Sequence, residues 1–104
     1  MTSRIEIFKQ MLVSDPVNTS VLFGLAKEYE KAGQDNNLIA TLERYLEISE
    51  DEGNGYGMLA AAYQRAGDLT KARDILQRGI DTAQRHGHPG MAEEFRMTLA
   101  SYED

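Results

Sequence analysis

The amino-acid sequence predicts an all-α fold made of antiparallel helix-turn-helix repeats. The first observation is an internal repeat, because residues 53–86 match residues 19–52 at an offset of 34 positions, which we call the repeat period. The identities are Leu25 with Leu59, Ala26 with Ala60, Tyr29 with Tyr63, Ala32 with Ala66, Gly33 with Gly67, Leu42 with Leu76, and Arg44 with Arg78. The second is that apolar residues recur every three or four positions, as on one helical face. The third is that no five residues alternate apolar and polar between turn residues. Self-similarity at this period is typical of stacked units that bury their apolar faces against neighbours.

Composition limits the chain to one domain with a modest core. It has 104 residues, of which 41% are hydrophobic and 27% charged, with a net charge of −6 and no cysteine. A disulfide framework and a thiolate metal site are therefore excluded. The negative charge disfavours nucleic-acid binding. No apolar run approaches the roughly 20 residues of a membrane helix, and the first residues lack a secretory h-region. We expect a cytoplasmic protein that binds neither nucleic acid nor membrane.

The first helix is predicted over residues 3–14. Ser3 and Glu6 fit a capping box, in which the serine side chain bonds the backbone of the third helical residue. The helix ends before Asp15-Pro16, because the residue before proline is pushed out of the α region. Its apolar face carries Ile5, Phe8, Met11 and Leu12.

Residues 19–52 form the first predicted repeat. Asn18 or Thr19 caps its first helix, and Gly33 supplies the left-handed residue that ends it. The short loop over residues 34–37 forces the second helix to run antiparallel to the first. The inward residues are Leu22, Leu25, Ala26 and Tyr29 on the first helix and Leu38, Leu42, Tyr45 and Leu46 on the second.

Residues 53–86 form the second predicted repeat, and a last helix follows over residues 89–102. The entry to this repeat is glycine-rich, and each glycine inside a helix costs about 0.5–1 kcal/mol relative to alanine. Gly67 ends its first helix and Gly87 its second, while Pro89 suits the first turn of the last helix. Met91, Ala92, Phe95, Leu99 and Tyr102 form an apolar stripe, so we expect this last helix to cap the array.

The repeat resembles the tetratricopeptide repeat (TPR), which has a period of about 34 residues and the pattern W-x2-L-G-x2-Y. Leu22-x2-Leu25-Ala26-x2-Tyr29 and Tyr56-x2-Leu59-Ala60-x2-Tyr63 are similar to its first helix. In the same frame the N-terminal helix looks like the second half of an earlier repeat. The resemblance implies about 2.5 TPR units and a C-terminal capping helix, stacked as a right-handed α-α superhelix. It also implies a scaffold that binds a peptide or protein segment in a concave groove.

The groove residues implied by the resemblance lie on the first helix of each repeat, opposite the buried stripe. They are Ser20, Phe23, Lys27, Glu30 and Lys31 in the first repeat, and Asn54, Gly57, Ala61, Gln64 and Arg65 in the second.

Phe23 is the sharpest feature of this face, because a large aromatic side chain opposite the core is available to anchor a ligand. The alternative is that it packs against Tyr56 or the N-terminal helix, or lies on the surface. The predicted groove face carries Lys27, Lys31 and Arg65 against the single Glu30, so its net charge is near +2 in an acidic chain. This asymmetry favours an acidic or carboxylate-ended ligand, and solvated lysines are the alternative.

No catalytic motif, cofactor motif or metal-ligand set is visible. His86 and His88 flank a turn glycine, and a zinc site needs three or four ligands. The acidic run between Glu43 and Glu52 fits a solvated helix face better than a divalent-metal loop. We expect a protein that is not an enzyme and carries no cofactor.

The alternative function is self-association into a homodimer through the N-terminal helix. Apolar residues surround most of this helix, which lacks the first helix of its own repeat, and an apolar helix at an open end favours stacking. The candidate residues are Ile5, Ile7, Phe8 and Met11. A third hypothesis makes the chain the terminal piece of a larger array, which the starting Met1 disfavours.

Overall fold

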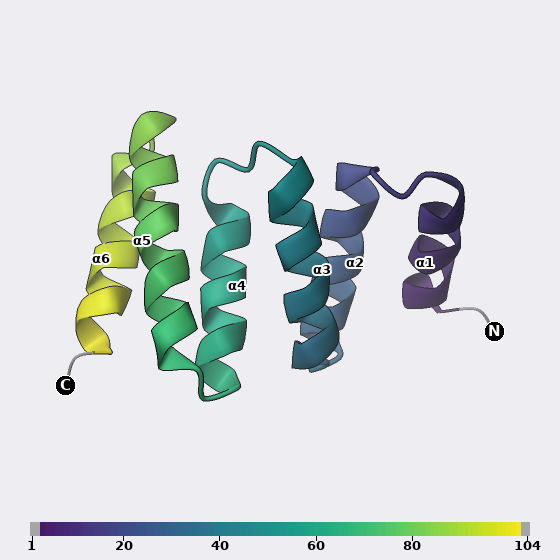
Figure 1. The fold of residues 1–104 in the computed structure, drawn as a ribbon, viewed down its shortest axis with the longest axis horizontal. Coiled ribbons are helices and arrows are strands. Elements are labelled where there is room, and N and C mark those ends of the chain that lie inside the picture. The colour runs from purple at the N-terminus through teal and green to yellow at the C-terminus, as the bar shows by residue number, and fades with distance from the viewer. Residues whose placement is uncertain (1–2, 103–104) are drawn as a thin grey trace. The chain divides into compact units, whose positions relative to one another are not determined.

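The computed structural model describes residues 3–102, and every regular element in this range is a helix. The elements in chain order are α1 (Arg4–Ser14), α2 (Thr19–Lys31), α3 (Asp35–Ile48), α4 (Asn54–Arg65), α5 (Leu69–Arg85) and α6 (Pro89–Ser101), shown in Figure 1. The predicted all-α class is therefore confirmed. Met1, on which the third hypothesis bears, lies outside the described residues.

The chain divides into two compact units, and the first is residues 1–49. In this unit α2 and α3 form an antiparallel hairpin, and α1 packs along α2 (Figure 1). The buried side chains are Val21, Leu22, Leu25, Ala26 and Tyr29 of α2 and Leu38 and Leu42 of α3. Helix α1 has no buried residue. Burying a large aliphatic side chain contributes about 1.5–3 kcal/mol, so the α2–α3 hairpin carries most of the stability of this unit.

The second unit is residues 50–104, in which α4 and α5 form a hairpin and α6 packs on α5 (Figure 1). Helix α5 buries the most residues, and Ile80, Ala83 and Ala92 form a cluster against which Met91, Phe95 and Leu99 pack. That residues 1–104 form a single domain, with repeats at 19–52 and 53–86, stays a prediction.

The two hairpins end their first helices in the same way. Tyr29 and Tyr63 are each 7% exposed. The amide of Gln34 donates to the Tyr29 carbonyl at 3.0 Å, and the amide of Asp68 donates to the Tyr63 carbonyl at 2.9 Å. Gly33 and Gly67, with φ of 70° and 82°, take the left-handed conformation that this turn needs. The repeat read from the sequence is therefore a repeat of local structure.

Helix starts follow the predicted capping chemistry. The hydroxyl of Ser3 accepts a hydrogen bond from the Glu6 amide at 3.2 Å, and the side-chain oxygen of Asn18 accepts from the Val21 amide at 3.1 Å. Helix α4 starts differently, because one carboxylate oxygen of Asp51 accepts from the amides of both Gly53 and Gly55, at 2.8 and 2.9 Å. No helix within residues 3–102 has both the length and the apolar character to span a bilayer.

Candidate functional site

Phe23 and Tyr45 form an aromatic pair on the α2–α3 hairpin. Phe23 projects from α2 and Tyr45 from α3, their ring centroids lie 5.1 Å apart, and the rings are tilted by 43°. Both residues are half-buried. A tilted pair at this separation is a favourable arrangement of two ring quadrupoles, worth about 0.5–1.5 kcal/mol beyond the buried area. The aromatic ring that packs on Phe23 is thus Tyr45 of its own hairpin, a neighbour that the sequence pattern does not predict.

Lys27 completes this surface. It lies one helical turn after Phe23, its ammonium nitrogen is 5.4 Å from the Phe23 ring centroid, and the residue is exposed. A cation over an aromatic face at an exposed site contributes about 0.5–1 kcal/mol. We call Phe23, Tyr45 and Lys27 the aromatic patch. It combines half-exposed ring surface with a positive charge that remains accessible to solvent.

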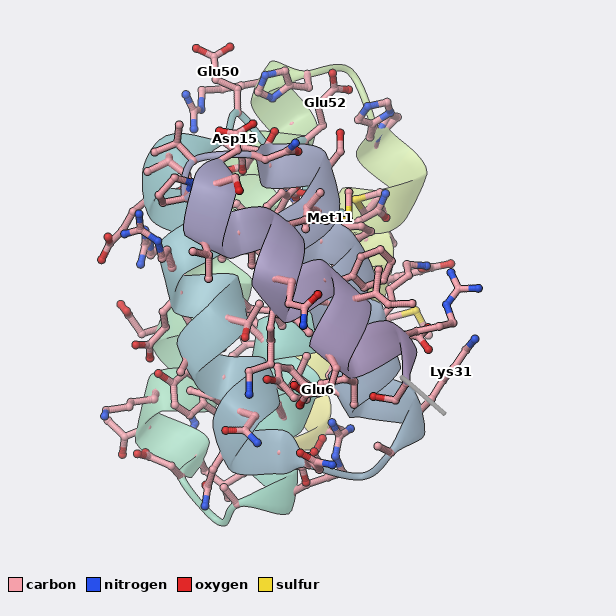
Figure 2. The ribbon with its side chains drawn as sticks, turned by 90° about the vertical axis from the view of Figure 1, so that its right-hand side faces the viewer. Glu6, Met11, Asp15, Lys31, Glu50 and Glu52 are labelled. Carbon is pink, nitrogen blue, oxygen red and sulfur yellow. The ribbon has the colours of Figure 1, made fainter. Side chains whose placement is uncertain are left out.

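The remaining predicted groove residues of α2 are exposed, but their charge is partly compensated. The Lys31 ammonium lies 3.5 Å from one carboxylate oxygen of Glu28, and the Arg4 guanidinium lies 3.5 Å from the other. Figure 2 shows Lys31 extending from the end of α2. The charge count from the sequence omitted Glu28, although a Glu–Lys spacing of three residues on a helix predicts this pair. Lys27 is therefore the cation most available to an acidic ligand on α2, where Ser20 and Glu30 are also exposed.

In the second unit, helix α6 covers part of the predicted groove set. Gly57 of α4 and Gly79 of α5 flank the ring of Phe95, and a Cβ placed on Gly57 would lie 2.9 Å from a Phe95 ring carbon. The hydroxyl of Tyr102 donates to the side-chain oxygen of Gln64 at 3.3 Å. Gly57 and Gln64 thus contact the last helix of the chain. The other predicted positions are Asn54 and Arg65, which are exposed, and Ala61, which is half-buried.

Sequence reasoning missed the Phe95 contact, although a signal for it exists. Counting one repeat period back from the two glycines gives Phe23 and Tyr45, so both aromatic positions of the first repeat are glycines in the second. Two side chains absent from facing positions leave room for a third, since protein interiors are closely packed. The ring of Phe95 occupies that room.

The four residues predicted for self-association divide between two sides of α1. Ile5 and Phe8 are half-buried, and a Cβ placed on Gly24 of α2 would lie 3.3 Å from the Phe8 ring. Ile7 and Met11 are 45% and 46% exposed. Figure 2 shows α1 toward the viewer, with Met11 labelled. Phe8 thus packs on α2 and Ile5 is half-buried, whereas Ile7 and Met11 are accessible to a partner.

The two histidines take structural positions at the turn between α5 and α6. His88 Nε2 lies 2.6 Å from a carboxylate oxygen of Glu52, and His86 Nδ1 lies 2.9 Å from the carbonyl oxygen of Thr82. The hydrogen bond from His88 lowers the pKa of the Glu52 carboxyl below its usual value. Among residues 3–102, no group of three or more histidine or acidic side chains is arranged to hold a metal ion.

These observations define the class of the protein: a helical-repeat protein of antiparallel hairpins, with a candidate binding surface on the first helix of a hairpin. No family model matches the sequence. The chain nevertheless belongs to the tetratricopeptide-repeat family, because it is 34% identical over 95 residues to the TPR repeat-containing protein PA0015 of Pseudomonas aeruginosa. That similarity covers 91% of this chain and 90% of the relative.

Two solved structures are similar in fold. The solution structure of protein BPP2914 from Bordetella parapertussis matches with a TM-score of 0.80 and 24% identity, covering 97% of this chain and 88% of that one. The crystal structure of MamA matches with a TM-score of 0.72 and 24% identity, covering 93% of this chain and 65% of that one. At these identities they establish the TPR-like helical fold alone.

Proposed function

We propose that the protein is a non-catalytic protein-interaction module that binds a peptide or protein segment on the aromatic patch. The observation that carries this proposal is the Phe23–Tyr45 pair, half-exposed on α2 and α3 with Lys27 above it. Residues of this kind dominate binding energy at protein interfaces, where aromatic anchors surrounded by polar groups recur. Membership of the TPR family supports the same function, since solenoid repeats present extended binding surfaces.

The chemistry of the patch favours an acidic or carboxylate-ended segment with a neighbouring apolar side chain. The apolar side chain would lie on the ring surface left exposed by Phe23 and Tyr45. A carboxylate beside it would pair with the Lys27 ammonium, and Lys31 would add attraction at longer range, although Glu28 compensates it. Exposed charges steer and select a partner more than they add affinity, so the ring surface would supply most of the binding energy.

The test compares capture by the immobilised wild-type protein with capture by the variant Phe23→Ala/Lys27→Glu. A lysate of the source organism is passed over each, and bound proteins are quantified by mass spectrometry. The matched control Val17→Ala/Lys9→Glu truncates one exposed apolar residue and reverses one exposed lysine outside the patch. We expect the patch variant to lose its specific partners by about tenfold or more, as for a hot-spot substitution, while the control retains them.

An identical set of partners at unchanged levels in the patch variant would refute the proposal. Circular dichroism of both variants must show the helical content of the wild type, because Phe23 also contributes to the hairpin through Tyr45. For this reason a small loss of stability in the patch variant is expected, and it has to be separated from the loss of binding.

A second candidate function is self-association through α1. The observation that favours it is the exposed pair Ile7 and Met11, which lie four residues apart and so form one stripe on a helix without buried residues. Light scattering of the wild type beside Ile7→Glu tests it. A larger mass for the wild type than for the variant supports self-association, whereas monomers in both samples at high concentration rule it out.

A further inference from the structure

The chain carries the two halves of one additional repeat at its opposite ends. Phe8 of α1 precedes Leu42 of α3 by one repeat period and Leu76 of α5 by two, so α1 stands in the position of a second helix. Helix α6 follows α5 after a glycine turn and stands in the position of a first helix. Helices α2 and α3, and α4 and α5, pair as first and second helices. Within the described residues 3–102, α1 and α6 each lack the mate that would complete their own repeat.

Helix α6 exposes a residue at a repeat position that is buried in both complete repeats. Met97 follows Tyr63 by one repeat period, and it is 67% exposed, whereas Tyr29 and Tyr63 are each 7% exposed. Ala100, which follows Ala66 by the same interval, is exposed on the same side of the helix. Next to it, an open cleft of about 360 Å³ lies between α5 and α6. Its lining residues are Gln77, Ile80, Arg96, Leu99 and Ala100.

Helix α1 exposes the complementary residues. Met11 precedes Tyr45 by one repeat period and Gly79 by two, and each of these contacts the first helix of its own repeat. Tyr45 packs on Phe23, and a Cβ placed on Gly79 would lie 3.0 Å from the Cβ of Tyr56. Met11 has no such first helix within residues 3–102 and is 46% exposed.

Ile7 extends the same stripe of α1. It precedes Ile75 of α5 by two repeat periods, and Ile75 is 7% exposed whereas Ile7 is 45% exposed. The exposed stripe of α1 thus consists of Met11, whose equivalents contact the first helix of their own repeat, and Ile7, whose equivalent Ile75 is buried.

We infer that α1 of one copy packs against α6 of a second copy and completes a repeat across the interface. The net charges are complementary, because Arg4 and Lys9 against Glu6 leave α1 at +1, and Arg96 against Glu93 and Glu94 leaves α6 at −1. Two copies of α1 facing each other would instead bring like net charges together. The inference deepens the self-association function and gives it a direction. A head-to-tail contact of this kind generates an open chain or a closed ring.

The test uses two double variants, each of which destroys one side of the interface. Ile7→Glu/Met11→Glu removes the apolar stripe of α1, and Met97→Glu/Ala100→Glu places two charges on the exposed face of α6 that α1 would cover. All four residues are exposed, so both variants retain the fold. In light scattering over a concentration series, we expect the mass of the wild type to rise with concentration. We expect each variant alone to associate at least about tenfold more weakly, because burying a carboxylate in an apolar contact is costly.

The decisive measurement is an equimolar mixture of the two variants. The first variant retains an intact α6 and the second retains an intact α1, so the mixture should form a 1:1 heterodimer through these two helices. The other two helices carry the new charges, so the heterodimer should not grow further. The controls Val13→Glu and Thr98→Glu place the same charge on other sides of α1 and α6, and they assemble as the wild type does. Val13 is 83% exposed, so it is a stringent control for exposed apolar surface on α1.

Four outcomes would overturn the inference. A wild-type dimer that survives Met97→Glu/Ala100→Glu would show pairing through α1 alone, leaving self-association intact. A mixture that stays monomeric, or a control that blocks assembly equally, would remove the proposed interface. A wild type that is monomeric throughout would remove self-association as well, while binding at the aromatic patch would still be decided by the capture experiment.

Discussion

Replacing Gly79 with alanine tests whether the absence of side chains at Gly57 and Gly79 provides the space that the Phe95 ring occupies. A Cβ built on Gly79 lies 3.0 Å from Tyr56 Cβ and 3.1 Å from the nearest ring carbon of Phe95. Alanine removes the cost of glycine in a helix, about 0.5–1 kcal/mol. Overpacking a filled site typically costs about 1–3 kcal/mol, which is the larger effect. We therefore expect Gly79→Ala to lower the free energy of unfolding by about 0.5–2 kcal/mol.

The assay is urea unfolding followed by far-UV circular dichroism, with Gly90→Ala as the matched control. Apart from its chain neighbours and the backbone of its own helix, nothing lies within 4 Å of a Cβ placed on Gly90, so alanine there should raise the free energy of unfolding by up to about 1 kcal/mol. A double-mutant cycle with Phe95→Leu should show that a smaller side chain on α6 recovers part of the loss, with a coupling of about 1 kcal/mol. If Gly79→Ala is as stabilising as Gly90→Ala, and the cycle shows no coupling, the packing argument is wrong.

Two further predictions concern the aromatic patch and the turn before α4. A double-mutant cycle of Phe23→Ala and Tyr45→Ala should give a coupling of about 0.5–1.5 kcal/mol in urea unfolding, and additive effects would contradict the contact between the rings. The pKa of the Glu52 carboxyl is lowered, chiefly because His88 donates a hydrogen bond to it. The ionised carboxylate therefore stabilises the fold above its unfolded pKa of 4.5, and this stabilisation is lost as the pH falls through the lower, folded pKa. The unfolding midpoints of wild type and Glu52→Gln should therefore differ near neutral pH and converge in acid. The control Glu50→Gln should match the wild type at every pH. A difference between wild type and Glu52→Gln that is the same at every pH would refute the prediction.

The helices and their ends could be predicted from the sequence because their causes are local. A cap such as Ser3 or Asn18 acts within three residues, and a turn glycine such as Gly33 is required by the backbone of the same turn. Because the two repeats share one period, a helix boundary predicted in one repeat predicts the equivalent boundary in the other. For this reason the structure places Tyr29 and Tyr63 in equivalent, buried positions, as predicted.

The contacts of the candidate site could not be predicted in the same way, because they join residues that are distant in the sequence. The pattern placed Phe23 opposite the buried stripe but placed Tyr45 inward, so it did not bring their rings together. The sequence predicts Gly57 as a groove residue that is unfavourable in a helix, and it predicts no packing role for Gly57 or Gly79. Their packing role depends on where α6 lies: the repeat spacing shows that two aromatic positions have become glycines, but it does not show which side chain fills the space.

The two repeats fill equivalent packing positions in different ways, and this difference supports the proposed location of the partner site. In the first repeat, Phe23 and Tyr45 fill the positions with their own rings and remain half-exposed. In the second repeat, the same positions are glycines, and the ring of Phe95 fills the space between them. A partner aromatic at the second site would have to displace Phe95, which packs against the buried cluster of α5 and α6. A partner at the first site would instead cover ring surface of Phe23 and Tyr45 that is already exposed, beside the mobile side chain of Lys27. The energetic difference between these two events supports the proposal that a partner binds at α2 and α3, and it favours the predicted capping role of α6.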